Sequence, residues 1–197
     1  MKKVLAIMAS PRKNKNTNSL IKFLLEGISK VDYTIDKVDL NSLEIRNCTG
    51  CDYCGHKGNC TVKDDMNILY DKFDKSDIII LAAPLYFNSL NGMAKNMIDR
   101  CQRYWSLKYS LGQNYKRGQD RVGIFLSVGG APFTFDQFSG TIPVIDFFFK
   151  AINAEYRGNY FVSNTDKVQI KDRQDIELDL RAIGENLSHL QKFHIQK

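Results

Sequence analysis

Patterns typical of buried strands alternate with patterns typical of amphipathic helices along the chain, and this alternation constrains the fold more than any other feature. The runs VLAIM (4–8) and DIIILAAPLY (77–86) are almost wholly apolar, as strands covered on both faces are, and we expect Pro84 to end the second. Further strand patterns stand at residues 33–40, 121–130 and 155–162. Helix patterns stand between and after them, at residues 20–28, 64–76, 92–103, 139–152 and 176–190.

Five strands that alternate with five helices predict an α/β fold, in which a parallel sheet carries helices on both faces. The sequence contains neither an internal repeat nor a linker, so we expect a single domain over residues 1–197. Two segments stand outside the alternation. One is a cysteine-rich loop at 47–63, and the other is residues 104–120, which we interpret as an insertion or mobile loop.

Sheets of this kind bind ligands outside the carboxyl ends of their strands. The loops at residues 9–19, 84–90 and 127–138 each follow a predicted strand at that end. We therefore expect these three loops to lie together. The cysteine loop follows the second strand, so we expect it at the same end of the sheet.

Charge and the length of the apolar runs limit the classes of partner. The net charge is +6, but the basic residues are scattered and match no nucleic-acid-binding module, so we expect no nucleic-acid partner. Because no apolar run approaches the roughly 20 residues that cross a bilayer, we expect no membrane contact. The N-terminus MKKVLAIMAS has too short an apolar part for a signal peptide, which predicts a cytoplasmic protein.

The loop SPRKNKNTNS (10–19) lies between the first strand and a helix start, and it is rich in groups that bind phosphate. Its hydroxyls, amides and free backbone N–H groups suit an anion at a helix N-terminus. It lacks both GxGxxG and GxxxxGK[ST], which argues against the standard dinucleotide and nucleotide loops. A plain polar loop with a helix cap explains the same residues equally well.

Two other loops carry weaker signals at the same end of the sheet. Tyr86 and Phe87 directly follow the best strand, where aromatic side chains can flank a flat ring or simply cap the core. Gly129 and Gly130 let the backbone approach a ligand closely, or make a tight turn. The shared location of the three loops favours a binding site more than any one of them does.

These stretches resemble a known family. IMASPRKNKNTNSL resembles the flavin-phosphate loop of the flavodoxin-like NAD(P)H-dependent FMN reductases, and APLYFNSLNGMAKNMIDR resembles the stretch where a strand-end Pro-x-Tyr lies against the isoalloxazine. The resemblance covers most of residues 1–130 and implies a flavodoxin-like, five-stranded sheet of order 2-1-3-4-5. The family has glycine where this chain has Ala9.

The same resemblance implies that FMN binds to this chain and that NAD(P)H is its reductant. It assigns the FMN phosphate to the first loop and the ribityl chain and ring to the second, with the diglycine nearby. The residues implied are Ser10, Arg12, Asn16, Thr17, Asn18, Pro84, Leu85, Tyr86, Phe87, Asn88, Gly129 and Gly130.

The segment CTGCDYCGHKGNC (48–60) holds four of the five cysteines, with gaps of two, two and five residues. A cytoplasmic chain keeps its thiols reduced, which argues against disulfides. Structural zinc usually takes paired ligands from two separate knuckles, whereas overlapping two-residue gaps wind the chain around one corner of an iron–sulfur cluster. Glycines in the longest gap permit the last cysteine to fold back. Zinc and free thiols remain as alternatives.

This segment, together with the DDM that follows it, resembles the compact cysteine motif of the iron–sulfur flavoproteins, a branch of the same family. By that resemblance a 4Fe–4S cluster lies beside the flavin, and its ligands are Cys48, Cys51, Cys54 and Cys60. Cys101 stands alone in a helix pattern, and we expect it to be buried packing. We expect the last helix to continue past its final patterned residue, Leu190, through His194, and His189 and His194 suggest no site.

Together these features predict an FMN-dependent NAD(P)H oxidoreductase that passes electrons between a reduced donor and a small-molecule or protein acceptor. The cofactor carries the chemistry, so we expect no side chain to act as a catalytic acid or base. The family resemblance implies a homodimer or homotetramer, with the cysteine loop or residues 104–120 at an interface. The alternatives are an electron carrier without enzymatic activity and a zinc-bearing interaction module.

Overall fold

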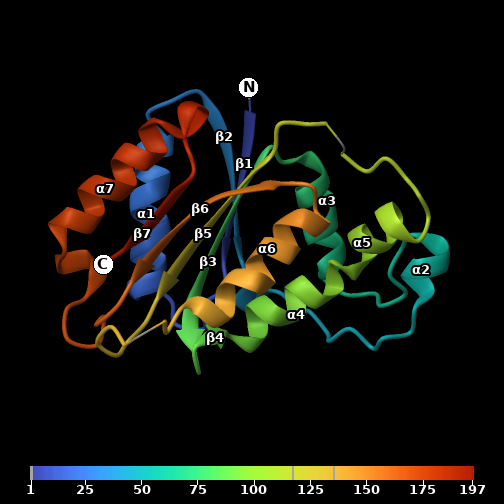
Figure 1. The fold of residues 1–197 in the computed structure, drawn as a ribbon, viewed down its shortest axis with the longest axis horizontal. Helices are drawn as coiled ribbons and strands as arrows, with labels where there is room; N and C mark the ends of the chain where they lie inside the picture. Colours follow the sequence, from blue (N-terminus) through green and yellow to red (C-terminus); the bar gives the residue numbers. More distant parts are fainter. Residues whose placement is uncertain (1, 117, 135) are drawn as a thin grey trace.

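A parallel sheet runs through the centre of the protein and carries helices on both faces (Figure 1). The computed structural model describes residues 2–116, 118–134 and 136–197. The strands lie in the order β2-β1-β3-β5-β6-β7, all parallel, and β4 pairs antiparallel with β3. Their bounds are β1 Lys2–Met8, β2 Tyr33–Asp39, β3 Ile78–Tyr86, β4 Ser89–Leu90, β5 Val122–Val128, β6 Glu155–Val162 and β7 Phe193–Gln196.

The helices form two layers. Helices α1 and α7 cover one face of the sheet, and α3, α4, α5 and α6 lie on the other side (Figure 1). The α-helices are α1 Asn16–Ile28, α2 Tyr53–Lys57, α3 Met66–Lys75, α4 Gly92–Arg100, α5 Gln102–Tyr109, α6 Ile142–Ala151 and α7 Gln174–Glu185. Short 3₁₀ turns are η1 Leu40–Ser42, η2 Ser139–Thr141, η3 Ile170–Asp172 and η4 Leu187–His189.

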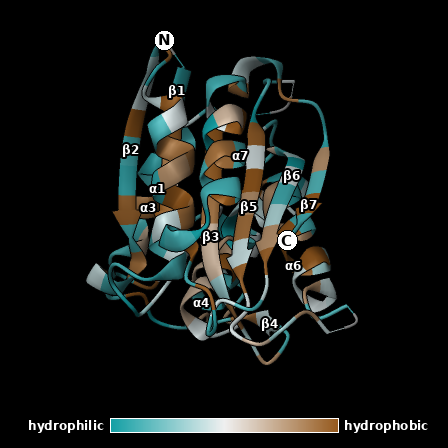
Figure 2. Cartoon of the chain, turned by 90° about the vertical axis from the view of Figure 1, so that its left-hand side faces the viewer, coloured by the Kyte–Doolittle hydropathy of each residue, from teal (hydrophilic) through white to brown (hydrophobic). Residues whose placement is uncertain are grey.

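The central strands are hydrophobic because both of their faces are covered. All seven residues of β5 and the first six residues of β3 are buried. Figure 2 shows these strands as mostly hydrophobic, between helices that carry both hydrophobic and hydrophilic residues. The flavodoxin-like α/β architecture expected from the sequence is confirmed. Among the described residues, no helix is both long and apolar enough to cross a membrane.

The sheet contains two strands more than the five expected. The hairpin strand β4 follows β3 directly, and β7 comes from residues that the sequence assigned to the last helix. Helix α7 ends at Glu185, and His194 lies in β7. The physical reason is that the spacing of hydrophobic residues changes from the helical period to the two-residue period of a strand. Phe193 and Ile195, two positions apart, both face the layer of α1 and α7. His189 lies in η4.

Pro84 does not end β3, which continues to Tyr86. The neighbouring strand β1 pairs with β3 only as far as Ala82, so Pro84 lies beyond it and removes no ladder bond on that side. On the other side Pro84 stays in register with Val128 of β5. The strand therefore extends past the sheet and carries its last residues over the carboxyl ends of its neighbours.

Residues 104–120 are partly helical, contrary to the expectation of a loop. Helix α5 continues to Tyr109 because Tyr104 is fully buried and packs edge-on against Tyr70 and Phe73. The described residues after α5 form turns and irregular structure until β5 begins at Val122. Residue 117 of this segment and residue 135 of the 127–138 loop lie outside the described residues.

Helices α1 and α7 pack closely because a glycine stands on each at the contact. A Cβ atom on Gly184 would lie 2.4 Å from the carbonyl oxygen of Leu24, and one on Gly27 would lie 2.2 Å from that of Arg181. These neighbours are backbone atoms, so a larger residue would require one helix to move.

We predict that Gly184→Ala lowers the free energy of unfolding by about 1–3 kcal/mol, the usual cost of overpacking, although alanine favours helix. Gly92→Ala is the matched control, because nothing lies within 4 Å of a Cβ there. Chemical denaturation of both variants checks the prediction. Equal free energies of unfolding for the two variants would show that α1 and α7 can move apart without loss of stability.

Candidate functional site

A polar cavity of about 330 Å³ opens at the carboxyl ends of β1, β3 and β5. Strand β1 lies between β2 and β3, so this is the point where the order of the strands reverses. The cavity is lined by Ser10, Arg12, Lys15, Asn16, Thr17, Pro84, Leu85, Tyr86, Val128, Gly130, Ala131, Thr165 and Asp166.

The start of α1 offers the cavity unpaired hydrogen-bond donors. Lys15 occupies the N-cap position without capping the helix through its side chain, and the first turn contains no acidic residue. The backbone N–H groups of the first turn have no acceptor within the helix. Thr17 is buried, and its hydroxyl bonds to none of the described residues. These donors and the positive helix end suit an anion.

The chain before α1 supports this arrangement. The Ser10 hydroxyl accepts a hydrogen bond from the backbone N–H of Arg12 at 3.3 Å, which closes a tight turn directly after β1. Asn14 adopts a left-handed backbone conformation with φ of 56°. The turn places the side chains of Arg12 and Lys15, both cationic, on the same cavity.

Asn16, which lines the cavity, also joins two distant segments of the chain. Its side-chain amide donates to the carbonyl of Thr165 at 3.2 Å and accepts from the N–H of Ile170 at 3.0 Å. It therefore ties the segment after β6 to the start of α1. This tether brings Thr165 and Asp166, which the sequence analysis did not select, into the cavity.

The end of β3 forms one wall. Pro84, Leu85 and Tyr86 line the cavity, and a two-residue turn then reverses the chain into β4. Phe87 and Asn88 occupy this turn with φ of 49° and 54°, the left-handed pair that a tight hairpin requires. The Phe87 side chain is fully exposed, and neither turn residue lines the cavity.

The two glycines after β5 lie in different surroundings. Gly130 lines the cavity, and a Cβ atom there would lie 2.5 Å from the carboxylate of Asp166. Gly129 faces Gln137, whose amide donates to the hydroxyl of Ser163 at 2.7 Å. Glycine at 130 leaves room for the Asp166 carboxylate in its present position, and a larger residue would displace that exposed side chain.

The structure brings together most of the cofactor residues implied by the sequence. Those that share the cavity are Ser10, Arg12, Asn16, Thr17, Pro84, Leu85, Tyr86 and Gly130. Those outside its lining are Asn18, Phe87, Asn88 and Gly129, and Asn18 lines a neighbouring groove with Lys13 and Asn14.

Sequence reasoning missed the contributions of Lys15, Val128, Ala131, Thr165 and Asp166. A signal for the last two was available, because residues 163–166 follow β6 at the same end of the sheet as the other loops. Lys15 and Ala131 stand inside loops that the sequence had already selected.

The four clustered cysteines line a second cavity, of about 240 Å³. Cys48 and Cys51 are exposed, and Cys54 and Cys60 are half-buried. Helix α2 carries Cys54, whose sulfur accepts from the Ser106 hydroxyl at 3.6 Å. The cavity lies against the junction of α4 and α5 and shares no lining residue with the first cavity.

The sulfur atoms surround this cavity without meeting at one point. Within residues 2–116, 118–134 and 136–197, no group of three His, Cys, Asp or Glu side chains is placed to hold a metal ion. A tetrahedral zinc site would need its sulfurs within about 3.8 Å of one another, since each Zn–S bond is about 2.3 Å. The fifth cysteine, Cys101, is buried in the core, as expected.

Hydrogen bonds favour the thiolate form of Cys51. The backbone N–H of Tyr53 and the hydroxyls of Thr61 and Thr49 together lower the pKa of the Cys51 thiol. The Thr61 hydroxyl lies 3.7 Å from its sulfur.

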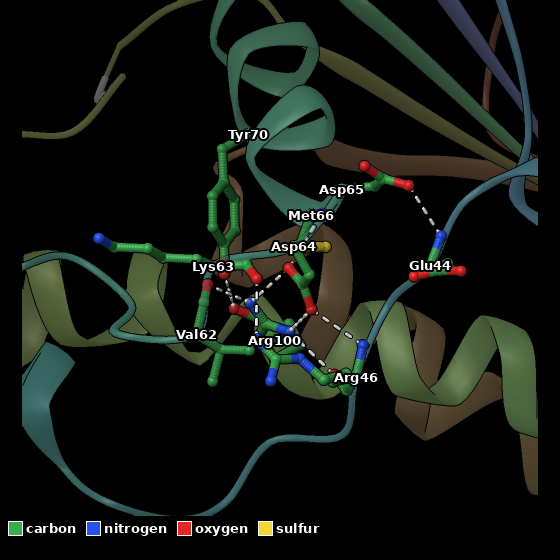
Figure 3. A network of polar contacts seen from close by, with 9 residues as sticks. All are labelled: Glu44, Arg46, Val62, Lys63, Asp64, Asp65, Met66, Tyr70 and Arg100. Carbon is green, nitrogen blue, oxygen red and sulfur yellow. Dashed lines mark hydrogen bonds and ion pairs between the residues drawn. The ribbon is translucent and has the colours of Figure 1, made fainter.

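A buried ion pair fixes both ends of the cysteine loop (Figure 3). The guanidinium of Arg100, at the end of α4, donates to the two carboxylate oxygens of Asp64 at 2.6 and 3.1 Å. It also donates to the carbonyl of Arg46, before the cysteines, at 2.9 Å and to that of Val62, after them, at 3.3 Å. One side chain thus holds the entry and the exit of the loop together.

Asp64 completes the network from the other side. Its carboxylate accepts from the N–H groups of Arg46 and Met66 at 2.9 and 3.1 Å (Figure 3). Burial opposes its ionisation, but the bonds from Arg100 and from these N–H groups outweigh burial and hold the pKa of Asp64 below its ordinary value. Tyr70, whose pKa burial raises, donates its hydroxyl to the carbonyl of Arg100 at 2.9 Å.

Comparison with known proteins gives one family and several relatives. The model of the NADPH-dependent FMN reductase family matches residues 2–137. An iron-sulfur flavoprotein of Archaeoglobus fulgidus is 39% identical over 98 residues, which cover 50% of this chain and 48% of the relative. One from Methanosarcina thermophila is 31% identical over 129 residues, 66% of this chain and 64% of the relative. The chain thus spans about half the length of the first curated relatives it matches.

Solved structures share the fold at low identity. An NAD(P)H:quinone oxidoreductase from Methanothermobacter marburgensis superposes with a TM-score of 0.69 at 14% identity, covering 95% of this chain and 98% of that one. An FMN-dependent NADH-azoreductase from Bacillus anthracis gives 0.69 at 13% identity, with 95% and 99% covered. These likenesses support the flavodoxin-like architecture.

We predict that Asp64→Asn lowers the free energy of unfolding at pH 7 by about 3–5 kcal/mol, because Arg100 would remain buried without its partner. Since the folded-state pKa of Asp64 is depressed, its contribution is complete above about pH 4 and is lost as pH falls through the folded-state value. The variant should therefore lose less stability on acidification than the parent.

Urea denaturation of both proteins between pH 2.5 and 7 measures this difference. Asp36→Asn provides a matched control at a more exposed ion pair with Lys72. Parallel pH profiles for the parent and Asp64→Asn would contradict the proposed anchoring role.

Proposed function

The chain belongs to the NADPH-dependent FMN reductase family, and from this we propose that it is an FMN-binding oxidoreductase that takes reducing equivalents from NAD(P)H. The observation that carries the proposal is the polar cavity at the carboxyl ends of β1, β3 and β5, with its unpaired donors at the start of α1. Its volume falls within the usual range for cofactor sites.

The residues of the cavity fit FMN in two parts. The N–H groups of the first turn of α1, the hydroxyls of Ser10 and Thr17, and the cations Arg12 and Lys15 suit the phosphate. The wall formed by residues 84–86 suits the ribityl chain and the flat ring. Asn16 acts at a distance by holding the 165–170 segment in place. When bound, FMN supplies the ability to accept a hydride and to release single electrons.

We also propose that the cysteine loop holds a 4Fe–4S cluster. Three observations support this proposal: the two-two-five spacing of the cysteines, the position of the four thiols around one cavity, and the similarity to relatives named iron-sulfur flavoproteins. A cluster binds each thiolate at a different iron, so the sulfurs need to surround a volume and not a point. The zinc alternative needs a convergence that the described residues lack.

The two cavities have separate linings, and a cluster that lies beside the flavin stays a prediction of the family resemblance. The proposed role is to connect a two-electron donor with a one-electron acceptor, which is a small molecule or a protein. Assembly into a homodimer or homotetramer stays a prediction of the family resemblance. The rival is an electron carrier, and steady oxidation of NAD(P)H by catalytic amounts of the chain separates the enzyme from it.

The test of the flavin proposal is a titration of the purified chain with FMN, followed by an NAD(P)H oxidation assay. We expect FMN binding, and Thr17→Val should weaken it about tenfold, because losing a hydrogen bond to a charged group costs about 1.5–3 kcal/mol.

Thr34→Val on β2 is the control for Thr17→Val. Thr165 lies in the cavity itself, so it is not suitable as a control. Equal FMN affinities for Thr17→Val and Thr34→Val would remove Thr17 from the site, and failure of the parent to bind FMN would overturn the proposed function.

The test of the cluster proposal is anaerobic reconstitution followed by assays of iron and sulfide. We predict about four of each per chain, lost in Cys54→Ala and retained in Cys101→Ala. Both variants should still bind FMN, because the two cavities share no residue. Zinc in place of iron, or four thiols that bind no metal, would overturn the proposal.

A further inference from the structure

The cysteine cavity contains a cation that has no carboxylate partner among the residues the structure describes. Arg103, on α5, lines the cavity together with the four cysteines. Its guanidinium carbon lies 4.6 Å from the ring centroid of Tyr70 and 5.5 Å from that of Tyr104. Among the described residues it makes no hydrogen bond or ion pair, and its Nε atom is buried without an acceptor.

The other cation of this cavity, Arg100, is neutralised by Asp64 at 2.6 Å. Of the two acids in the lining, Asp99 pairs with Lys95 at 2.7 Å, and the exposed Asp52 lies 3.4 Å from His56, which is charged only when protonated. Among the described lining residues, Arg103 is therefore the cation without a carboxylate partner.

Packing explains how this charge is held without being neutralised. The faces of Tyr70 and Tyr104 attract a guanidinium through their quadrupoles, but they carry no net charge. Both rings are buried, and Tyr70 also belongs to the network that fixes the cysteine loop. The position of Arg103 is thus set by the same core that sets the ends of the loop.

We propose that Arg103 is the charge-compensating residue of the cysteine cavity, which stabilises an anionic cluster there and raises its reduction potential. This inference rests on the proposed 4Fe–4S cluster. A cluster held by thiolates is anionic, and uptake of one electron from a reductant adds a further negative charge while no bond breaks. A cation nearby stabilises the reduced form more than the oxidised form.

The experiment compares three variants after anaerobic reconstitution, with iron and sulfide assayed first and the midpoint potential of the cluster then measured spectroscopically against dithionite. Arg103→Met removes the charge, and Arg103→Lys keeps it. Lys75→Met removes one charge from α3 at a separate surface groove, so it matches the change in net charge.

We expect Arg103→Met to lower the ratio of reduced to oxidised cluster at a fixed potential about tenfold, which is 59 mV for a one-electron couple. Arg103→Lys should stay near the parent, and Lys75→Met should equal it. If Arg103→Met binds no cluster while Arg103→Lys does, the charge is needed to hold the anion, which also supports the proposal.

Three results would overturn it. Equal potentials for Arg103→Met and Lys75→Met would show that the charge has no effect, with the cluster itself intact. Loss of the cluster in both Arg103 variants would assign the residue to packing. A parent chain that binds no iron would remove the proposed cluster and this inference together, while FMN binding would still stand.

Discussion

The ion pair between Arg100 and Asp64 is the interaction on which the cysteine loop depends. A long loop with few apolar residues cannot fix its own ends by burial. Here the buried guanidinium of Arg100 donates to a carbonyl on each side of the loop. The carboxylate of Asp64 accepts from backbone N–H groups on each side of it. The pair is almost fully buried, and the backbone bonds that both side chains make offset much of the cost of burying it, although the Nε atom of Arg100 has no acceptor among the described residues.

A second buried arginine does the same for the opposite end of α3. Arg121, which precedes β5, donates to the carbonyls of Phe73 and Ser76 where α3 ends. Cations are favoured there by the negative end of the helix dipole. Asp64 stands just before the start of the same helix. Helix α3 is therefore fixed at both ends by arginines from other elements, and it links the cysteine loop to the sheet.

The sequence was most informative where one pattern continues over many residues. The buried runs of β1, β3 and β5 correctly predicted that the loops of the polar cavity lie together, because parallel strands bring their carboxyl ends to one edge. The sequence patterns failed where contacts between distant parts of the chain determine the local structure. The tether from Asn16 to Thr165 spans 149 positions, and β7 forms by pairing with β6 shortly after leucines whose spacing suggests a helix. The turn at Phe87, which directs that ring away from the cavity, is equally invisible to periodicity.

The contrast between the ends and the middle of the cysteine loop bears on how it would take up a cluster. The ends are held by buried polar bonds, whereas α2, in the middle, buries none of its five residues. Helix α2 ends at Gly58, which adopts a left-handed conformation and lies beside Leu107. The helix therefore has a defined end although few of its atoms are buried. The ends of the loop are already held by Arg100 and Asp64, so ligation of a cluster would order only the thiols between them. Metal binding would therefore be coupled to the local structure of the loop and not to folding of the sheet. The polar cavity at the ends of β1, β3 and β5 shares no lining residue with the cysteine cavity, so its walls do not depend directly on the thiols.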